Sequence, residues 1–119
     1  MSKYRIKLFA SFLFLVFGIS ACFESKENAF VIAESKSYET SIYRQQCAVC
    51  HGPEGEGKTL DDGRIVPSLR SGHFKAITTD AIYKQIADGG NGMTPFRAQL
   101  TERELQLMAE FVRRDLREQ

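Results

Sequence analysis

The chain has few of the residues that often stabilise a small domain, such as tryptophan in the core, proline in loops and cysteine in disulfides. Its 119 residues contain no tryptophan, only three prolines and only three cysteines, and this length supports one domain at most. No segment shows the alternation of apolar and polar residues that is typical of strands. Charges nearly balance, with a formal net charge of +1, so the sequence has neither the basic stripe of a nucleic-acid-binding protein nor a polybasic membrane patch.

The N-terminal apolar run is too short to cross a membrane. It covers Leu8–Ile19, and twelve helical residues span only about 18 Å of a bilayer core of roughly 30 Å. Three basic residues precede the run and small residues follow it, which is the pattern of a secretory signal peptide. We therefore expect residues 1–21 to be a signal peptide; the alternative is an uncleaved anchor that extends to Phe23.

The end of this run, ISAC at Ile19–Cys22, resembles the lipobox of bacterial lipoproteins. The resemblance implies cleavage before Cys22 and lipid on its thiol and new amino group; the alternative is an ordinary signal peptide with a stray cysteine. An odd number of cysteines leaves a reactive thiol in an exported protein, and lipidation of Cys22 removes it. We expect residues 22–37 to be a lipidated tether, in which the apolar stretch AFVIA (residues 29–33) could dock on the domain.

The remaining residues, 38–119, are expected to form one helical domain with long loops. Apolar residues at helical spacing predict a first helix over residues 38–50. Glycine and proline then punctuate residues 52–69, which predicts a long ordered loop. A short helix is expected over residues 79–88, with a threonine cap before it and Gly89 after it.

The last helix has the clearest signals. Thr101 and Glu104 form a T-x-x-E capping box. The apolar stripe that follows consists of Leu105, Met108, Val112 and Leu116, with Phe111 beside it. Short helices and long loops bury little apolar surface, so we expect a large flat cofactor to complete the core.

The pentapeptide CAVCH, Cys47–His51, indicates which cofactor. On a helix, Cys47, Cys50 and His51 share one face, so two thiols can add to the vinyl groups of a haem while the imidazole ligates its iron. A redox disulfide of the thioredoxin type would require a βαβ context, and a zinc site would require four ligands, whereas only His73 lies outside the motif.

With this motif, residues 38–117 resemble the small bacterial class I cytochromes c. The resemblance implies an all-α cytochrome c fold, with three to four short helices and long loops around one covalent haem c. The matching features are IYRQQCAVCHG (residues 42–52), GEGK (55–58), VPSL (66–69), GMTPF (92–96) and LTERELQLMAEFV (100–112).

The family's second axial ligand is a methionine from a loop after the third helix, which implies Met93. Met108 belongs to the apolar stripe and is expected to pack in the core, and His73 is the alternative ligand. The family usually has Met-Pro at this point, whereas Thr94 intervenes here. The resemblance also implies that the Pro67 carbonyl accepts the other ring N–H of His51; the alternative is a plain turn residue.

Two further pairs of residues follow from the resemblance. Tyr43 and Phe111 are expected to make the aromatic contact at the crossing of the first and last helices. Arg64 and Arg70 flank Pro67, and either could pair with a haem propionate or remain a solvated surface charge.

These features predict a one-electron carrier and no enzyme. A haem whose axial positions are closed by His51 and Met93 passes electrons but does not readily bind oxygen or substrate. We expect the carrier to be exported, held by its lipid on the periplasmic face of a bacterial membrane, and to exchange electrons with an oxidase, reductase or dehydrogenase. The alternatives are a cytochrome c subunit of such a complex and a haem-based sensor with one open iron site.

Overall fold

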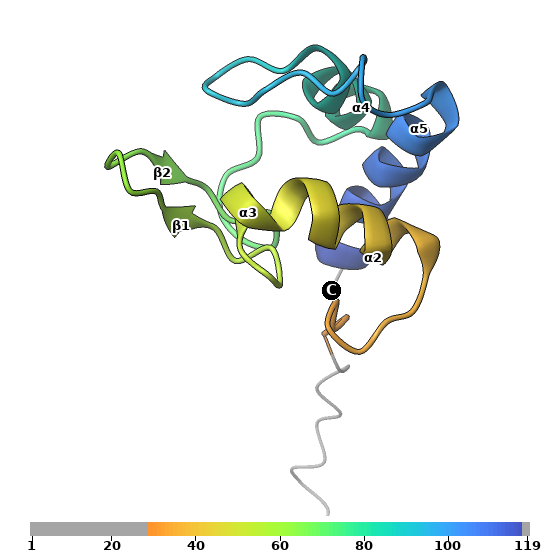
Figure 1. Cartoon of the computed structure of the whole chain (residues 1–119), viewed down its shortest axis with the longest axis horizontal. Coiled ribbons are helices and arrows are strands. Elements are labelled where there is room, and N and C mark those ends of the chain that lie inside the picture. Colours follow the sequence, from red (N-terminus) through yellow and green to blue (C-terminus); the bar gives the residue numbers. More distant parts are fainter. Residues whose placement is uncertain (1–28, 118–119) are drawn as a thin grey trace, which may run out of the picture.

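The computed structural model describes residues 29–117 as a helical domain with one small β-hairpin (Figure 1). Its first helix is continuous through three segments: α2 (Tyr38–Ile42), the π-helical η1 (Tyr43–Cys47) and α3 (Ala48–His51). The other elements are β1 (Lys58–Thr59), β2 (Ile65–Val66), α4 (Thr79–Asp88), α5 (Glu102–Phe111) and the π-helical η2 (Val112–Arg117). The expectation of an all-α cytochrome c fold with three to four short helices is confirmed.

The first helix begins where the sequence predicted and contains a π-helical stretch that the sequence did not reveal. Ser37 caps it, since the Ser37 side chain accepts a hydrogen bond from the Thr40 N–H. In η1 the Ala48 N–H reaches back to the carbonyl of Tyr43, five residues earlier, as in a π-helix. This wider turn runs into the CAVCH motif, since Cys47 is its last residue.

The helices α4 and α5 are bounded by the residues that the sequence indicated. The Thr78 hydroxyl accepts the Ala81 N–H at 3.1 Å at the start of α4. Gly89, with a φ of 71°, ends that helix. Thr101 and Glu104 form the complete capping box of α5, so two backbone donors that would otherwise lack partners are satisfied.

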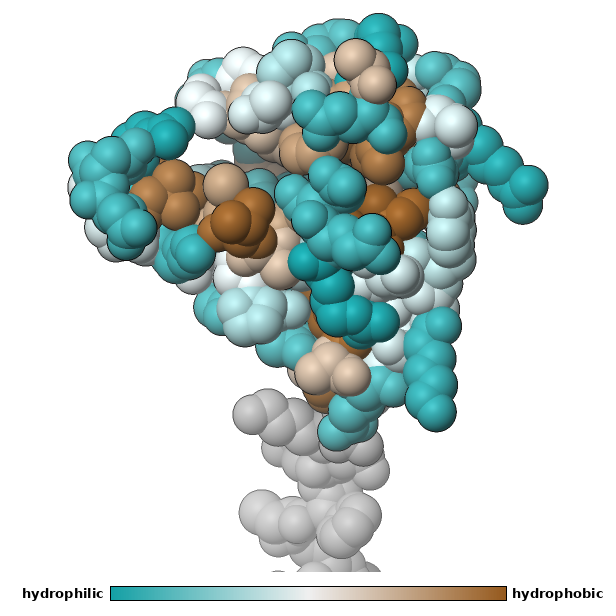
Figure 2. All heavy atoms as spheres, in the orientation of Figure 1, coloured by the Kyte–Doolittle hydropathy of each residue, from teal (hydrophilic) through white to brown (hydrophobic). Residues whose placement is uncertain are grey.

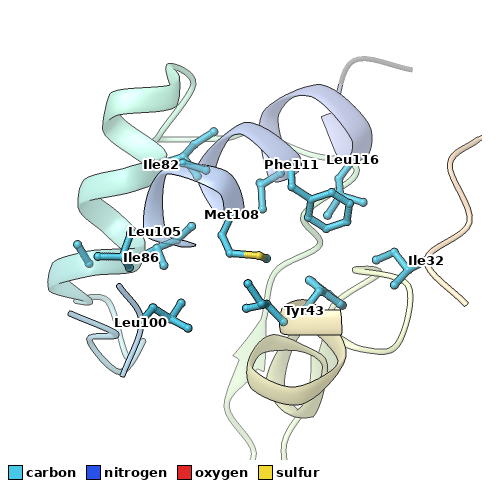
Figure 3. Packing of buried hydrophobic residues seen from close by; sticks show 13 residues of the cluster. Ile32, Tyr43, Ile82, Ile86, Leu100, Leu105, Met108, Phe111 and Leu116 are labelled. Atoms are coloured by element: carbon cyan, nitrogen blue, oxygen red, sulfur yellow. The ribbon is translucent and has the colours of Figure 1, made fainter. Parts of the chain in front are cut away.

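The core lies between α4, the last helix and the first helix, and it contains the apolar stripe predicted for α5 (Figure 3). The Tyr43 and Phe111 rings meet edge-on, with 6.0 Å between their centroids. This is the expected aromatic contact between the first and last helices. The fully buried large side chains of the core include Ile32, Tyr43, Leu105, Met108, Phe111 and Leu116.

Residues 52–69 contain a small β-hairpin, where the sequence predicted a loop without strands. Lys58 pairs with Val66 and Thr59 with Ile65 in antiparallel register. Two residues per strand are too few to produce a recognisable alternation in sequence. The rest of this segment is the ordered loop that was expected.

The segment from Phe30 to Ser35, which we call the strap, is fastened to the domain. Ile32 has an exposed fraction of 0%, and the Phe30 ring packs edge-on against Phe111 at 5.6 Å. The Glu54 carboxylate accepts the N–H groups of Ile32 (2.7 Å) and Ala33 (2.8 Å). The expected docking of AFVIA is thus a specific set of contacts.

Two arginines complete the fastening of the strap. Arg44 donates to the carbonyls of Ile32 (2.7 Å) and Ser35 (3.1 Å). Arg70 donates to the Phe30 carbonyl at 2.8 Å and pairs with Glu54 at 3.2 Å. Because Arg70 has these partners, its role in this structure is to hold the strap.

Within residues 29–117, no helix is both long and apolar enough to span a bilayer. The expected signal peptide and the expected lipidation site, Cys22, lie outside the described residues.

Candidate haem site

The CAVCH motif forms the end of the first helix. Cys47 is half-buried and packs against the core, whereas Cys50 is exposed on α3. No disulfide joins these two cysteines. The helix ends at Gly52, directly after the motif, where φ is 84°. The His51 carbonyl accepts the Gly57 N–H at 2.7 Å. The loop that follows is thereby tied directly to the histidine.

The buried environment of Cys47 does not suit a redox-active thiol. Burial, with a smaller contribution from Cys50, raises the pKa of Cys47 to about 12. Reactive redox cysteines instead have a depressed pKa, because only the thiolate attacks a disulfide. Nor do the residues from 29 to 117 bring together any group of three or more histidine, cysteine, aspartate or glutamate side chains that could hold a metal ion.

The surroundings of His51 favour the neutral form of its imidazole. Burial lowers the pKa of His51 below its usual value, and the backbone of Pro67 partly opposes this effect. The imidazole is therefore neutral at pH 7, which is the form that ligates iron. Its Nδ1 is buried and makes no hydrogen bond in this structure, although the Pro67 backbone is close enough to influence the pKa of the imidazole. The role of Pro67 remains a prediction.

Met93 lies in the loop that follows α4, which we call the Met loop (Gly89–Arg97). Gly90 and Met93 exchange two backbone hydrogen bonds, each of 3.0 Å. Farther along the loop, Phe96 and Arg97 donate to the last carbonyls of α4, those of Ile86 (3.0 Å) and Ala87 (3.1 Å). The loop is therefore folded back onto the helix and holds Met93 half-buried at the edge of the core.

The other sequence candidates for the second axial ligand lie elsewhere. Met108 is 1% exposed in the core (Figure 3), as its place in the apolar stripe predicted. His73 is exposed on the segment before α4. Of the two methionines that the structure describes, only Met93 stands on a loop.

The surface near CAVCH is hollowed and incompletely covered. Figure 2 shows a recess between the hairpin and the upper part of the molecule, where the Met loop lies in Figure 1. Two apolar side chains of this region are largely open to solvent: Val49, 66% exposed on α3, and Ile65, 80% exposed on β2. A hollow of about 330 Å³ between α3 and the hairpin is lined by Cys50 but by neither of the predicted axial ligands, His51 and Met93.

A family model described as cytochrome c oxidase, cbb3-type, subunit III matches residues 39–112. This match covers more than half of the chain. The chain belongs to this family of c-type cytochrome domains and is a small monohaem cytochrome c. No curated protein and no solved structure gave a significant match.

The geometry of the cytochrome fits its cofactor, a covalently bound haem c. Cys47 and Cys50 stand three residues apart on one helical turn, as thioether attachment requires. His51, one position farther, carries a buried imidazole that is neutral at pH 7, the form that ligates iron. When bound, the haem supplies reversible one-electron chemistry. The cytochrome is accordingly an electron-transfer protein and not a catalytic enzyme.

Arg64 connects the hairpin with the Met loop of the cytochrome. Its guanidinium pairs with Asp62 at 2.7 Å and donates to the Gly92 carbonyl at 3.3 Å. Arg64 therefore spans the two segments that border the recess. Sequence reasoning did not find this contact, because nothing in the local pattern pairs residues 28 positions apart.

Proposed function

We propose that the cytochrome is a one-electron carrier in which His51 and Met93 occupy the two axial positions of the haem iron. The observation that carries this proposal is the placement of the methionines. Met108 is enclosed by the core, whereas Met93 is presented by a loop whose backbone is fixed to α4. A ligand held by a fixed loop costs little ordering entropy when it binds.

This ligand set suits electron transfer. Two protein ligands leave no open position for oxygen or substrate, and a thioether raises the potential relative to a second histidine. If one axial site were open, the reduced protein would bind carbon monoxide at neutral pH, and the sensor alternative would hold. We expect no carbon monoxide binding in the wild type.

We further propose that lipid on Cys22 anchors the cytochrome to the periplasmic face of a bacterial membrane. The strap supports a close attachment, because its packed part begins at Phe30. Eight residue steps separate Cys22 from Phe30, so the two are at most about 28 Å apart even in a fully extended chain. The domain would therefore stay close to the membrane surface.

Membrane fractionation tests the anchor. Cys22→Ser should release the cytochrome from membranes or block its maturation, while Ser25→Ala, in the residues that follow, should leave it membrane-bound. The anchor proposal is wrong if Cys22→Ser stays on the membrane with its signal peptide normally removed.

The family description favours one class of partner. It names subunit III of a cbb3-type cytochrome c oxidase, so we propose an oxidase as the electron acceptor, with a permanent subunit of such a complex as the alternative to a free carrier. Gentle detergent extraction followed by size-exclusion chromatography separates the two. A free carrier elutes alone, whereas a subunit coelutes with a much larger haem-containing complex.

A further inference from the structure

Gln85, in the last turn of α4, places its side-chain amide beside the Met loop. The amide nitrogen lies 3.0 Å from the Gly89 carbonyl, 3.1 Å from the Gly90 carbonyl and 4.0 Å from the Met93 sulfur. Carbonyl oxygens only accept hydrogen bonds, so the two glycines require the N–H end of the amide to face the loop. The same end therefore faces the thioether.

The backbone leaves little freedom for this arrangement to change. A β-carbon at Gly89 would come within 2.6 Å of the Met93 carbonyl and 2.8 Å of the Pro95 nitrogen, so the Met loop passes tightly over the end of α4. The paired hydrogen bonds between Gly90 and Met93 fix the turn itself. What remains to be positioned is the side chain of Met93, and Gln85 is the polar group beside its sulfur.

We propose that Gln85 is a positioning residue for the axial thioether, which holds the Met loop through two carbonyls and turns the N–H end of the same amide toward the Met93 sulfur. The inference rests on the proposed role of Met93 as a ligand. Hydrogen bonds to a ligand are an established means of tuning a haem potential. The positive end of the amide dipole near the sulfur disfavours Fe(III), which carries one more positive charge than Fe(II), so Gln85 raises the potential.

Gln85→Leu tests the proposal, because it removes the amide and keeps a good helix-forming side chain of similar size. Gln106→Leu is the control, since Gln106 is another glutamine on a helix whose side-chain amide donates a hydrogen bond, to Glu110 at 3.0 Å. Three properties are measured in the holoprotein: the weak long-wavelength charge-transfer band of methionine-ligated ferric haem, the reduction potential, and the affinity of the ferric protein for imidazole.

For Gln85→Leu we expect a weakened or shifted band, a lower potential and imidazole binding that is tighter by about fivefold, the equivalent of one lost hydrogen bond. Gln106→Leu should leave all three unchanged. If Gln85→Leu lowers stability but leaves the three properties at wild-type values, Gln85 only caps the helix and the proposal is overturned. A potential that rises would also overturn it.

Two further results keep the outcomes distinct. If Gln85→Leu does not fold, Gln85→Asn replaces it, because its shorter amide falls short of the sulfur and the same three changes are expected. If the wild type itself lacks the charge-transfer band, Met93 is not the ligand, and both the proposed function and this inference fail. If the wild type shows the band but Gln85→Leu leaves the band, the potential and the imidazole affinity unchanged, only the inference about Gln85 is overturned.

Discussion

The Tyr43 ring packs edge-on against the Phe111 ring, with 6.0 Å between centroids and 63° between planes, while its hydroxyl donates a 2.8 Å hydrogen bond to the Gly52 carbonyl. The Tyr43 side chain thus joins the last helix to the residue that directly follows the CAVCH motif. Burial raises the pKa of Tyr43 well above its usual range, so the hydroxyl remains a donor at any ordinary pH.

This contact predicts a large penalty for shortening Phe111. Phe111→Ala should lower the free energy of unfolding of the holoprotein by about 3–5 kcal/mol, through lost burial and the cavity left behind. Tyr43→Phe keeps the ring contact and should cost only about 1–2 kcal/mol, for the unpaired Gly52 carbonyl. Denaturant titration followed by circular dichroism measures both. If the two substitutions lowered the free energy of unfolding equally, ring packing would not be the main source of stability at this contact.

Met93 and Met108 should respond oppositely to substitution. Met93→Ala should abolish the long-wavelength charge-transfer band, lower the potential and open the iron to carbon monoxide, because no thioether is left to close the site. Met108→Leu conserves volume in the core, so it should cost less than about 1.5 kcal/mol and leave the band intact. Absorption spectra of the two ferric variants decide the matter. The assignment fails if Met108→Leu removes the band and Met93→Ala retains it.

The strap should loosen when Glu54 is neutralised. Glu54→Gln weakens the hydrogen bonds to Ile32 and Ala33 and leaves Arg70 without its charged partner, at a cost of about 1.5–3 kcal/mol. Amide hydrogen exchange at Ile32 and Ala33 should accelerate, while exchange within α4 stays slow. Glu34→Gln is the control, since it removes an exposed carboxylate from the same segment. Unchanged exchange at Ile32 and Ala33 in Glu54→Gln would show that burial of Ile32 alone holds the strap.

The capping box of α5 should make stability depend on pH in the acidic range. Hydrogen bonds from Tyr38 and then from Thr101 lower the pKa of Glu104 from 4.5 to about 2. A depressed pKa stabilises the folded state above about pH 4.5, and this contribution is lost as the pH falls from there to about 2. Glu104→Gln keeps the box but removes the charge, so its stability should fall less steeply over this range.

Denaturant midpoints measured at a series of acidic pH values, from above the usual pKa of a glutamate down to the depressed pKa of Glu104, provide the test. Glu110→Gln, which removes another carboxylate of α5, should behave as the wild type does. A Glu104→Gln variant with the wild-type pH dependence would show that the ionised form of Glu104 gives the folded protein no added stability.

The parts of the fold that depend on local sequence could be predicted. The capping box of Thr101 and Glu104 and the end of α4 at Gly89 each follow from a few neighbouring residues. The comparison with known families confirmed the cytochrome c fold and the haem.

The parts that depend on distant contacts could not be predicted. Glu54 binds Ile32 of the strap, 22 positions earlier in the chain, and Arg70 binds Phe30, 40 positions earlier. No sequence pattern connects residues so far apart. For Arg70 the sequence suggested a propionate or solvent, because a lone arginine next to a loop shows no partner. The π-helical turn in η1 likewise depends on one shifted hydrogen bond that leaves no trace in composition.

The most direct measurement of the central claim is the mass of the tryptic peptide that spans residues 45–58, bounded by Arg44 and Lys58. With one haem c attached through Cys47 and Cys50, the peptide should carry the added mass of a single haem and absorb as a haemochrome, even after extraction with acidified butanone. An unmodified peptide, with free thiols or a disulfide and the haem lost to the butanone, would contradict the account.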